Sequence, residues 1–253
     1  MTQFVILVPD FGGRAVTGAF AQGLREMYPT AHLMFGLNGL PKVDLQSIAQ
    51  SVPTFFDTLI YDGDTKIVGT LTALYNKALL SFAEGSVFVR LDSAEHDPNY
   101  IGILAKEADQ DEVLVVGDLS FVEGQTLNKG TPDWDAHKEI FPKMYGDATQ
   151  GKVQIGCAHG FMAAQAGVVK KILPRMLRIL ERAGQKAGQP LTWGFDGAMI
   201  LAAVQEGVQV KISPVPAMIL RNRNAGKVKD QTDQHCLLTE AAMEVAKEDG
   251  IKI

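Results

Sequence analysis

Short apolar runs alternate with segments of helical spacing along the first half of the chain, and this alternation restricts the possible fold more than any other feature of the sequence. The apolar runs have the length of buried strands and occupy residues 4–8, 32–35, 58–61, 87–91 and 113–116. Helical spacing lies between them, at residues 18–27, 45–52, 70–83 and 100–108. Because strands alternate with helices, the helices can cover both faces of a mainly parallel sheet. The pattern therefore predicts an α/β fold.

A different pattern begins at residue 119. From 119 to 150, glycine and proline residues interrupt every apolar period, so we expect a long loop excursion there. Beyond it we expect a short apolar piece at 153–155, a helix over 164–187 with a break near Pro174, a helix over 197–205, a strand over 208–212 and a helix over 240–248. Gly207 and Gly250 are expected to end the helices that precede them. We predict one domain with three parts, at 1–118, 119–150 and 151–253.

The charge balance and the cysteines argue against several classes of protein. Lys and Arg number 24 against 29 Asp and Glu, a net charge of −5, which argues against a broad nucleic-acid-binding face. The two cysteines, Cys157 and Cys236, match no metal or redox spacing and suggest no disulfide framework. The apolar run that ends at Pro9 fits a buried strand better than a signal peptide, and the longest uncharged stretch, 153–169, is interrupted by polar residues and glycine. We expect a cytoplasmic protein without a transmembrane segment and without a nucleic-acid partner.

Carboxylates follow the strand predicted at 87–91. Asp92 comes directly after it, and Glu95 and Asp97 come shortly afterwards. Ligands of parallel sheets bind at the carboxyl ends of the strands, and carboxylate oxygens there can hold a hard divalent cation. The alternative is a turn in which Asp97 caps a helix that begins at Pro98. That alternative leaves Asp92 and Glu95 without a structural role.

The order of motifs in the first half resembles that of the family 2 glycosyltransferases, which have the GT-A fold and use nucleotide-sugar donors. Members of this family show a strand ending in Pro-x-aromatic, a helix bearing Gly, Ala and Asn, and a strand ending in Asp-x-Asp, often followed by His-Asp-Pro. Similar residues occur here in the same order: Pro9, Asp10 and Phe11, then Gly69, Ala73, Asn76, Ala83 and Gly85, then Asp92, and then His96, Asp97 and Pro98. The resemblance implies a single GT-A domain, with a nucleotide-sugar-binding half at 1–118 and an acceptor half at 151–253. It also implies that Pro9, Asp10 and Phe11 contact the nucleotide-sugar donor.

The metal motif departs from the family pattern. Ala94 stands at the second Asp position, and the segment that leads to His96 is one residue shorter than usual. Either Glu95 replaces the second carboxylate, or Asp92 holds the metal alone with water and phosphate oxygens. The resemblance implies Mn²⁺ or Mg²⁺ at Asp92 and Glu95, where the cation would neutralise the departing diphosphate.

The second half carries residues that resemble the acceptor side of the family. The segment 156–173 is similar to a Gly-x-x-x-Gly-Phe acceptor segment, and 193–216 is similar to the next block, in which an acidic residue opens a helix. Asp196 falls at that acidic position. In inverting members the residue there takes the proton from the acceptor hydroxyl as a general base. The alternative is that Asp196 is only the N-cap of the helix over 197–205.

Four further residues are candidates for contacts with substrates. His159 is a candidate for contact with the acceptor or a phosphate, and its alternative role is purely structural. Arg223 and Lys229 match the spacing of an Arg-x-x-Gly-x-Ser-Lys element found in some family members. This resemblance implies a loop that stabilises the leaving diphosphate. The alternative is a run of charged side chains exposed to solvent. Asp62 follows the strand predicted at 58–61 and could accept from the nucleobase or ribose, or form an Asx turn with Gly63.

The resemblance as a whole implies a metal-dependent, inverting glycosyltransferase. It would move a sugar from a nucleotide-diphosphate-sugar donor to a hydroxyl acceptor. Two alternatives stay open. One is a nucleotide-sugar-binding protein without turnover, because the second Asp of the metal motif is missing. The other is a sugar nucleotidyltransferase, whose Gly-rich basic signature after the first strand is poorly matched by Gly12, Gly13 and Arg14.

Overall fold

The structure, a computed structural model, describes residues 2–10, 18–38, 55–62, 67–91, 98–118, 161–191, 194–216 and 228–251. The strands are β1 (Phe4–Asp10), β2 (His32–Asn38), β3 (Thr58–Asp62), β4 (Val87–Arg90), β5 (Val113–Asp118), β6 (Met162–Gln165) and β7 (Gln209–Pro216). The helices are α1 (Gly18–Met27), α3 (Ile67–Ser81), α4 (Ile101–Ala108), α6 (Ala166–Ala187), α7 (Phe195–Gln205) and α8 (Val228–Glu248). A short 3-10 helix, η1 (Pro98–Tyr100), leads into α4.

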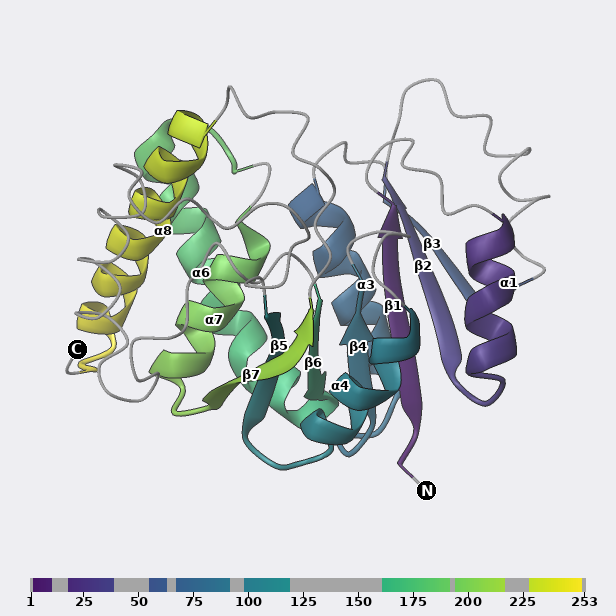
Figure 1. Ribbon diagram of the computed structural model, residues 1–253. Coiled ribbons are helices and arrows are strands. Elements are labelled where there is room, and N and C mark those ends of the chain that lie inside the picture. The colour runs from purple at the N-terminus through teal and green to yellow at the C-terminus, as the bar shows by residue number, and fades with distance from the viewer. Residues whose placement is uncertain are drawn as a thin grey trace.

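The described strands form one seven-stranded sheet in the order β3-β2-β1-β4-β6-β5-β7 (Figure 1). β1 pairs in parallel with β2 and β4, β2 with β3, and β5 with β7. β6 lies antiparallel between β4 and β5. The mostly parallel α/β sheet predicted from the sequence is confirmed, with one strand of opposite direction inserted in it. All the described strands except β6 therefore have their carboxyl ends at one edge of the sheet.

Two apolar cores lie on opposite faces of this sheet. Successive residues of β1 alternate between them, with Val5 and Leu7 in one core and Ile6 and Val8 in the other. Helices α3, α6, α7 and α8 cover the first core, and α1 and α4 cover the second (Figure 1). Because both faces are covered, the inner strands are apolar on both sides, which explains their continuous apolar runs.

Most of the predicted elements are confirmed. The helix predicted over 18–27 coincides with α1, and the helices at 100–108 and 197–205 correspond to α4 and α7. Gly207 and Gly250 follow α7 and α8 with φ angles of 71° and 69°, which glycine adopts without steric cost. Local periodicity and helix-stop glycines were sufficient to locate these elements.

Two predictions about the region of α6 are wrong. Residues 164 and 165, predicted to begin a helix, instead end β6. Backbone pairing with β4 and β5 on both sides outweighs the helix preference of this segment. The helix is also continuous through Pro174, where a break was expected. Ile172 and Met176 on either side of the proline are fully buried, and this burial offsets the hydrogen bond that proline cannot make.

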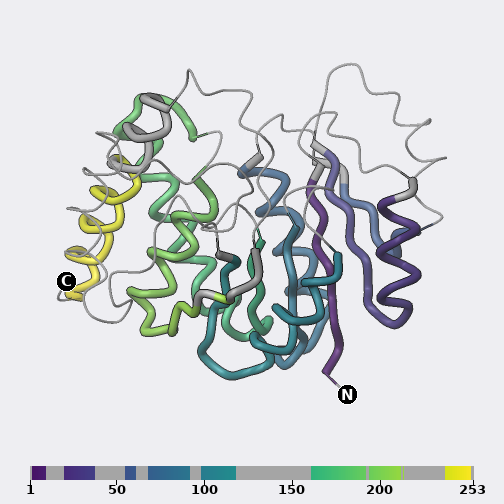
Figure 2. The backbone as a smooth tube through the Cα atoms, viewed as in Figure 1, coloured from purple at the N-terminus to yellow at the C-terminus, as the bar shows by residue number. Residues whose placement is uncertain are grey.

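Helix α8 is longer than the helix predicted over 240–248 and begins at Val228. It packs against α6 and α7, and the C-terminus lies beside it, whereas the N-terminus leads into β1 inside the sheet (Figure 2). The helix predicted over 45–52, the excursion at 119–150 and the piece at 153–155 lie outside the described residues. Among the helices that the structure describes, none combines the length and the apolar character needed to cross a membrane.

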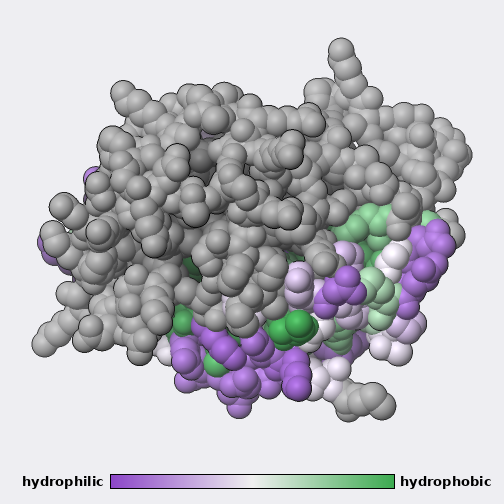
Figure 3. Space-filling view, viewed as in Figure 1, coloured by the Kyte–Doolittle hydropathy of each residue, from purple (hydrophilic) through white to green (hydrophobic). Residues whose placement is uncertain are grey.

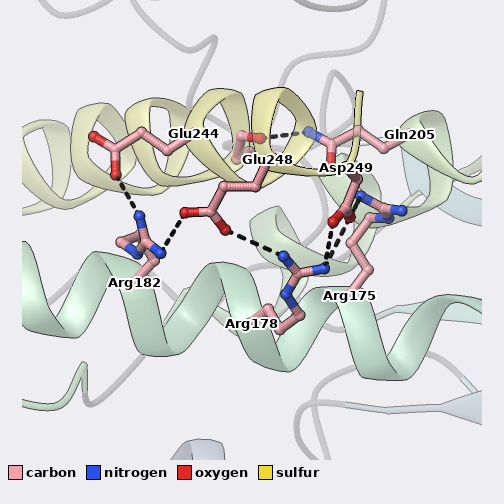
Figure 4. A network of polar contacts seen from close by, with 8 residues as sticks. Arg175, Arg178, Arg182, Gln205, Glu244, Glu248 and Asp249 are labelled. Carbon is pink, nitrogen blue, oxygen red and sulfur yellow. Dashed lines mark hydrogen bonds and ion pairs between the residues drawn. The ribbon is translucent and has the colours of Figure 1, made fainter. Parts of the chain in front are cut away.

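Ion pairs join α6 to α8 along their exposed sides (Figure 4). Their N-to-O distances lie between 2.6 and 3.3 Å. We call this set the α6–α8 ion-pair network: Arg175 with Asp249, Arg178 with Glu248 and Asp249, Arg182 with Glu244 and Glu248, and Lys186 with Glu240 and Glu244. The network fastens α8 over the first core. Elsewhere on the molecule, the described residues visible in the lower part of Figure 3 expose both hydrophilic and hydrophobic areas.

Candidate active site

The carboxyl edge of the sheet carries three of the predicted site residues. Pro9 and Asp10 are the last residues of β1, and Asp62 is the last residue of β3. β2 separates these two strands in the sheet, and Pro9 is buried. Ligands of open α/β sheets bind at this edge, so the structure brings these positions to the expected side of the molecule.

Arg90 is a charged residue inside the sheet, at the last position of β4. It pairs with Leu7 of β1 on one side and with Met162 of β6 on the other. Its side chain is only 1% exposed. Burying a guanidinium costs free energy unless it is paired with an anion, so Arg90 requires an anionic partner close by.

Within the described part of the chain, the guanidinium of Arg90 contacts an acidic side chain, a methionine sulfur and an aromatic ring. Nη2 forms an ion pair with Oδ1 of Asp196. Nη1 donates a hydrogen bond to Sδ of Met162 at 3.9 Å. The guanidinium carbon also lies 5.4 Å from the centroid of the Phe195 ring, within the range of a cation–π contact. The charge is therefore held between an anion, a polarisable sulfur and an aromatic ring.

Asp196 lies in the first turn of α7, and its side chain is 23% exposed. The helix begins at Phe195 and its N-cap is Gly194, with no side-chain capping bond, so the alternative that Asp196 is an N-cap is wrong. Gly194 has a φ angle of 104°, and a Cβ atom there would lie 2.8 Å from Cδ1 of Leu238. Glycine is thus required at the point where the chain turns into α7.

Phe195 anchors the beginning of α7 in the core. Its ring stacks on Tyr75 of α3, with the centroids 5.6 Å apart and the planes at 11°. Both rings are at most 2% exposed. The start of α7 is therefore anchored in the core next to Arg90, and the carboxylate of Asp196 lies where the core meets solvent.

The segment 92–97 is bounded by anchored residues at both ends. Before it, Leu91 is fully buried, and its N–H donates to the carbonyl oxygen of Leu7 at 2.9 Å. After it, the hydroxyl of Tyr28 donates to the carbonyl oxygen of Pro98 at 2.5 Å and accepts from the N–H of Gly102 at 3.1 Å. Pro98 opens η1, a 3-10 turn before α4, so the helix expected to begin at Pro98 starts as a tighter turn.

Asp57 anchors the beginning of β3 to α1. Arg25 Nη2 donates to Asp57 Oδ2 at 2.7 Å, and the N–H of Leu33 donates to the same oxygen at 2.8 Å. Burial raises the pKa of Asp57, but the Leu33 hydrogen bond and the Arg25 guanidinium outweigh it and leave this pKa below its ordinary value. β3, which ends in Asp62, is therefore fastened at its start.

Several of the predicted site residues lie outside the described residues. They are Phe11, Asp92, Glu95, His159 and Arg223. Lys229 lies in the first turn of α8, and the side chains of Lys229, Asp10 and Asp62 are not described. Within the described ranges, no three His, Cys, Asp or Glu side chains come together as a metal site. The metal assignment to Asp92 and Glu95 stays a prediction.

Arg90 was missed in the sequence analysis, although the signal was present. It is the one charged residue in the otherwise apolar run at 87–91. A charged side chain inside a buried strand needs a partner of opposite charge. Arg90 therefore predicts an anionic side chain on a neighbouring element. Only the structure shows that the anion is Asp196, from a helix 106 positions further along the chain.

The fold is similar to those of several solved structures. One is the glucosyl-3-phosphoglycerate synthase of Mycobacterium tuberculosis in complex with Mn²⁺, UDP and phosphoglyceric acid, with a TM-score of 0.63 and 11% identity, covering 100% of this chain and 80% of that chain. Another is the mannosyl-3-phosphoglycerate synthase of Rubrobacter xylanophilus, with a TM-score of 0.57, 11% identity and coverage of 100% and 76%. A third is a 4-diphosphocytidyl-2C-methyl-D-erythritol synthase, with a TM-score of 0.52, 13% identity and coverage of 92% and 98%. No protein-family model and no curated protein matches the sequence.

Identities this low establish the fold alone. The similarity extends over the whole of this chain in the first two structures. It agrees with the seven-stranded, mostly parallel sheet and its covering helices in the described part of the chain. The chain has the GT-A fold.

Proposed function

We propose that this protein is a metal-dependent glycosyltransferase that moves a sugar from a nucleotide-diphosphate-sugar donor to a hydroxyl acceptor. The observation that carries the proposal is the ion pair between Asp196 and Arg90. Arg90 stands two positions before Asp92, the proposed metal ligand, so the candidate base lies beside the strand end that leads to the metal segment. A general base for the acceptor and a carboxylate that holds a cation against the donor diphosphate are two groups that metal-dependent, inverting glycosyl transfer uses.

The residues present fit a divalent cation in chemical type. Asp92 and Glu95 offer carboxylate oxygens, which Mn²⁺ and Mg²⁺ prefer, and they follow the anchored residue Leu91 at the carboxyl edge. When bound there, the cation would neutralise charge on the donor diphosphate. Glu95 then replaces the second Asp of the family motif.

Asp196 acts as the general base in this proposal. The acceptor oxygen forms a bond to the anomeric carbon while the bond from that carbon to the diphosphate oxygen breaks. The electron pair of that bond leaves with the diphosphate, and the acceptor proton passes to the carboxylate of Asp196. Attack on the face opposite the leaving group inverts the anomeric configuration.

The other candidate residues would bind the donor and the acceptor. Pro9, Asp10, Phe11 and Asp62 would bind the nucleoside at the ends of β1 and β3. Arg223 and Lys229 would stabilise the leaving diphosphate by charge-assisted hydrogen bonds. His159 would contact the acceptor or a phosphate. The net charge of −5 and the two isolated cysteines support a cytoplasmic reaction without a nucleic-acid partner.

A second candidate is a sugar nucleotidyltransferase, which shares this fold. It is favoured by the similarity to the diphosphocytidyl-methyl-erythritol synthase, which covers 98% of that chain. The two functions differ in their products. Glycosyl transfer releases a nucleoside diphosphate, whereas nucleotidyl transfer consumes a nucleoside triphosphate and releases pyrophosphate.

Ligand-dependent stabilisation and product analysis test the proposal. A thermal-shift panel of UDP-, GDP- and dTDP-sugars, each with and without Mn²⁺, should identify a donor, because a ligand that binds only the native state raises its stability. The donor found is then incubated with hydroxyl acceptors, including phosphoglyceric acid, and the products are analysed by mass spectrometry. A glycosylated acceptor and a nucleoside diphosphate are expected. Metal-dependent donor binding without transfer or donor hydrolysis would instead indicate a binding protein without turnover.

A further inference from the structure

Arg90 pairs with the proposed base Asp196, but no step of the proposed chemistry is assigned to Arg90 itself. It lies in an inner strand of the sheet and projects from the face of the first core, because Phe88, two positions earlier, belongs to that core. Every other residue of β4 is apolar and buried. A buried arginine in this setting is not explained by packing.

Stability alone is a weak reason for such an ion pair. Removing two charges from water costs free energy, and apolar residues of similar volume often serve equally well in a core. Phe195 and Met162 already provide an apolar and polarisable wall around this position. Apolar residues at both position 90 and position 196 would fill the space without a desolvation cost.

The two ends of α7 are held in different ways. At its C-terminal end, Arg175 of α6 forms an ion pair with Glu206, and Arg175 is 12% exposed. At its N-terminal end, Phe195 stacks in the core on Tyr75. The backbone of α7 is thus positioned without Arg90. What Arg90 adds is a fixed direction for one carboxylate, that of Asp196.

We infer that Arg90 is a positioning residue that aims the carboxylate of Asp196 at the acceptor hydroxyl. This inference rests on the proposed function. The planar guanidinium is itself oriented by the Phe195 ring and the Met162 sulfur, so it presents Nη2 to Asp196 in one geometry. A base aimed in this way meets the acceptor without reorganisation, and a misplacement of about 1 Å can cost about 10²-fold in rate.

The test compares two substitutions of Arg90 with a matched control. Arg90→Met removes the charge but keeps the length of the side chain, and Arg90→Lys keeps the charge without the planar fork. Arg175→Met is the control, because it removes another mostly buried arginine that pairs with a carboxylate at the other end of α7. The assay measures kcat for transfer, KM for the acceptor, Kd for the donor with Mn²⁺, and Tm.

Arg90→Met is expected to lower kcat by about 10²-fold while the Kd of the donor changes less than about threefold. Arg90→Lys should recover part of this loss. Arg175→Met should lower Tm without a comparable loss of kcat. An Arg90→Met variant whose kcat matches that of Arg175→Met at similar Tm would overturn the inference.

A double variant covers the case in which Arg90→Met folds poorly. If Arg90 acts through Asp196, Asp196→Asn combined with Arg90→Met should lose no more kcat than Asp196→Asn alone. Multiplicative losses would show that Arg90 acts independently of Asp196 and would overturn the inference. Failure of the proposed function is a different result, since wild-type protein would then transfer no sugar to any acceptor.

Discussion

The hydroxyl of Tyr28, directly after α1, donates a hydrogen bond to the carbonyl oxygen of Pro98 at 2.5 Å, although the two residues are 70 positions apart. The same hydroxyl accepts from the N–H of Gly102. Tyr28 therefore fixes the chain where the segment 92–97 ends and η1 begins. This segment carries the proposed metal ligands Asp92 and Glu95.

Tyr28→Phe should weaken both stability and metal-dependent donor binding. It removes two hydrogen bonds but keeps the ring, which packs edge-on against Phe4 at 5.7 Å. The expected loss of unfolding free energy is about 1–3 kcal/mol, measured by urea denaturation. Calorimetric titration should also show a higher Kd for the donor with Mn²⁺. The control is Gln110→Ala, which removes one hydrogen bond beyond the other end of α4. An unchanged donor Kd in Tyr28→Phe would separate Tyr28 from the site.

Asp92→Ala should abolish the part of donor binding that depends on Mn²⁺. A carboxylate at the strand end supplies an oxygen ligand that alanine lacks. Calorimetric titration with and without Mn²⁺ measures the effect, and Tm should change little. Asp111→Ala, at an exposed position before β5, serves as the control. Unchanged, metal-dependent affinity in Asp92→Ala would remove Asp92 from the site.

Glu95→Gln and Asp97→Asn should have different effects. If Glu95 takes the place of the missing second Asp, Glu95→Gln should weaken Mn²⁺ binding while leaving Tm unchanged. If Asp97 caps the turn at Pro98, Asp97→Asn should preserve metal affinity and change stability only slightly, since Asn caps about as well as Asp. Asp97→Ala should lower the free energy of unfolding by about 0.5–2 kcal/mol. The opposite pattern of metal affinities would exchange the two roles.

Asp196→Asn should abolish acceptor-dependent turnover while preserving donor affinity. An amide cannot take the acceptor proton, so kcat should fall by roughly 10²–10⁴-fold. Because Asp196 pairs with buried Arg90 and is not an N-cap, we also expect a lower Tm, corresponding to about 1–3 kcal/mol. Glu206→Gln, which weakens the ion pair with Arg175 at the other end of α7, is the matched control for stability. Transfer at a near wild-type rate in Asp196→Asn would assign Asp196 to structure alone and would point to His159 as the base.

The α6–α8 ion-pair network should make stability depend on pH in the acid range. Hydrogen bonds from Lys186 and Arg182 lower the pKa of Glu244, and the hydrogen bond from Arg178 lowers the pKa of Asp249. These carboxyl groups bind protons less readily in the folded than in the unfolded chain. Their stabilising effect is therefore present above the unfolded pKa of about 4 and is lost as the pH falls through the lower folded pKa.

The pH dependence is measured with the double variant Glu244→Gln, Asp249→Asn. Its Tm should lie below the wild-type Tm at pH 7 and approach it at pH 3. High salt should reduce the difference at pH 7, because these side chains are partly exposed and screened. A constant difference in Tm from pH 7 to pH 3 would show that the network contributes no pH-dependent stability.

Local features of the sequence determined where most elements lie. The helical spacing of 18–27 located α1, the apolar run of 87–91 located β4, and Gly207 located the end of α7. Each of these signals depends only on residues a few positions apart, so it can be recognised in the sequence before the fold is known. The alternation of strands and helices also implied the mostly parallel sheet, because each connecting helix joins two parallel strands and covers a face of the sheet.

Tertiary structure alone decided the features that join distant segments. Residues 162–165 became β6 because β4 and β5 offered backbone partners on both sides, and an antiparallel insertion leaves no periodic signal in the sequence. The partner of Arg90 could not be read from position 90, since several acidic residues lie downstream and only the packing of α7 on the sheet selects Asp196. The sequence by itself thus determined most helices and strands and the need for an anion beside Arg90. Long-range packing determined that this anion is Asp196, because the pairing depends on contacts between distant segments that no local pattern encodes.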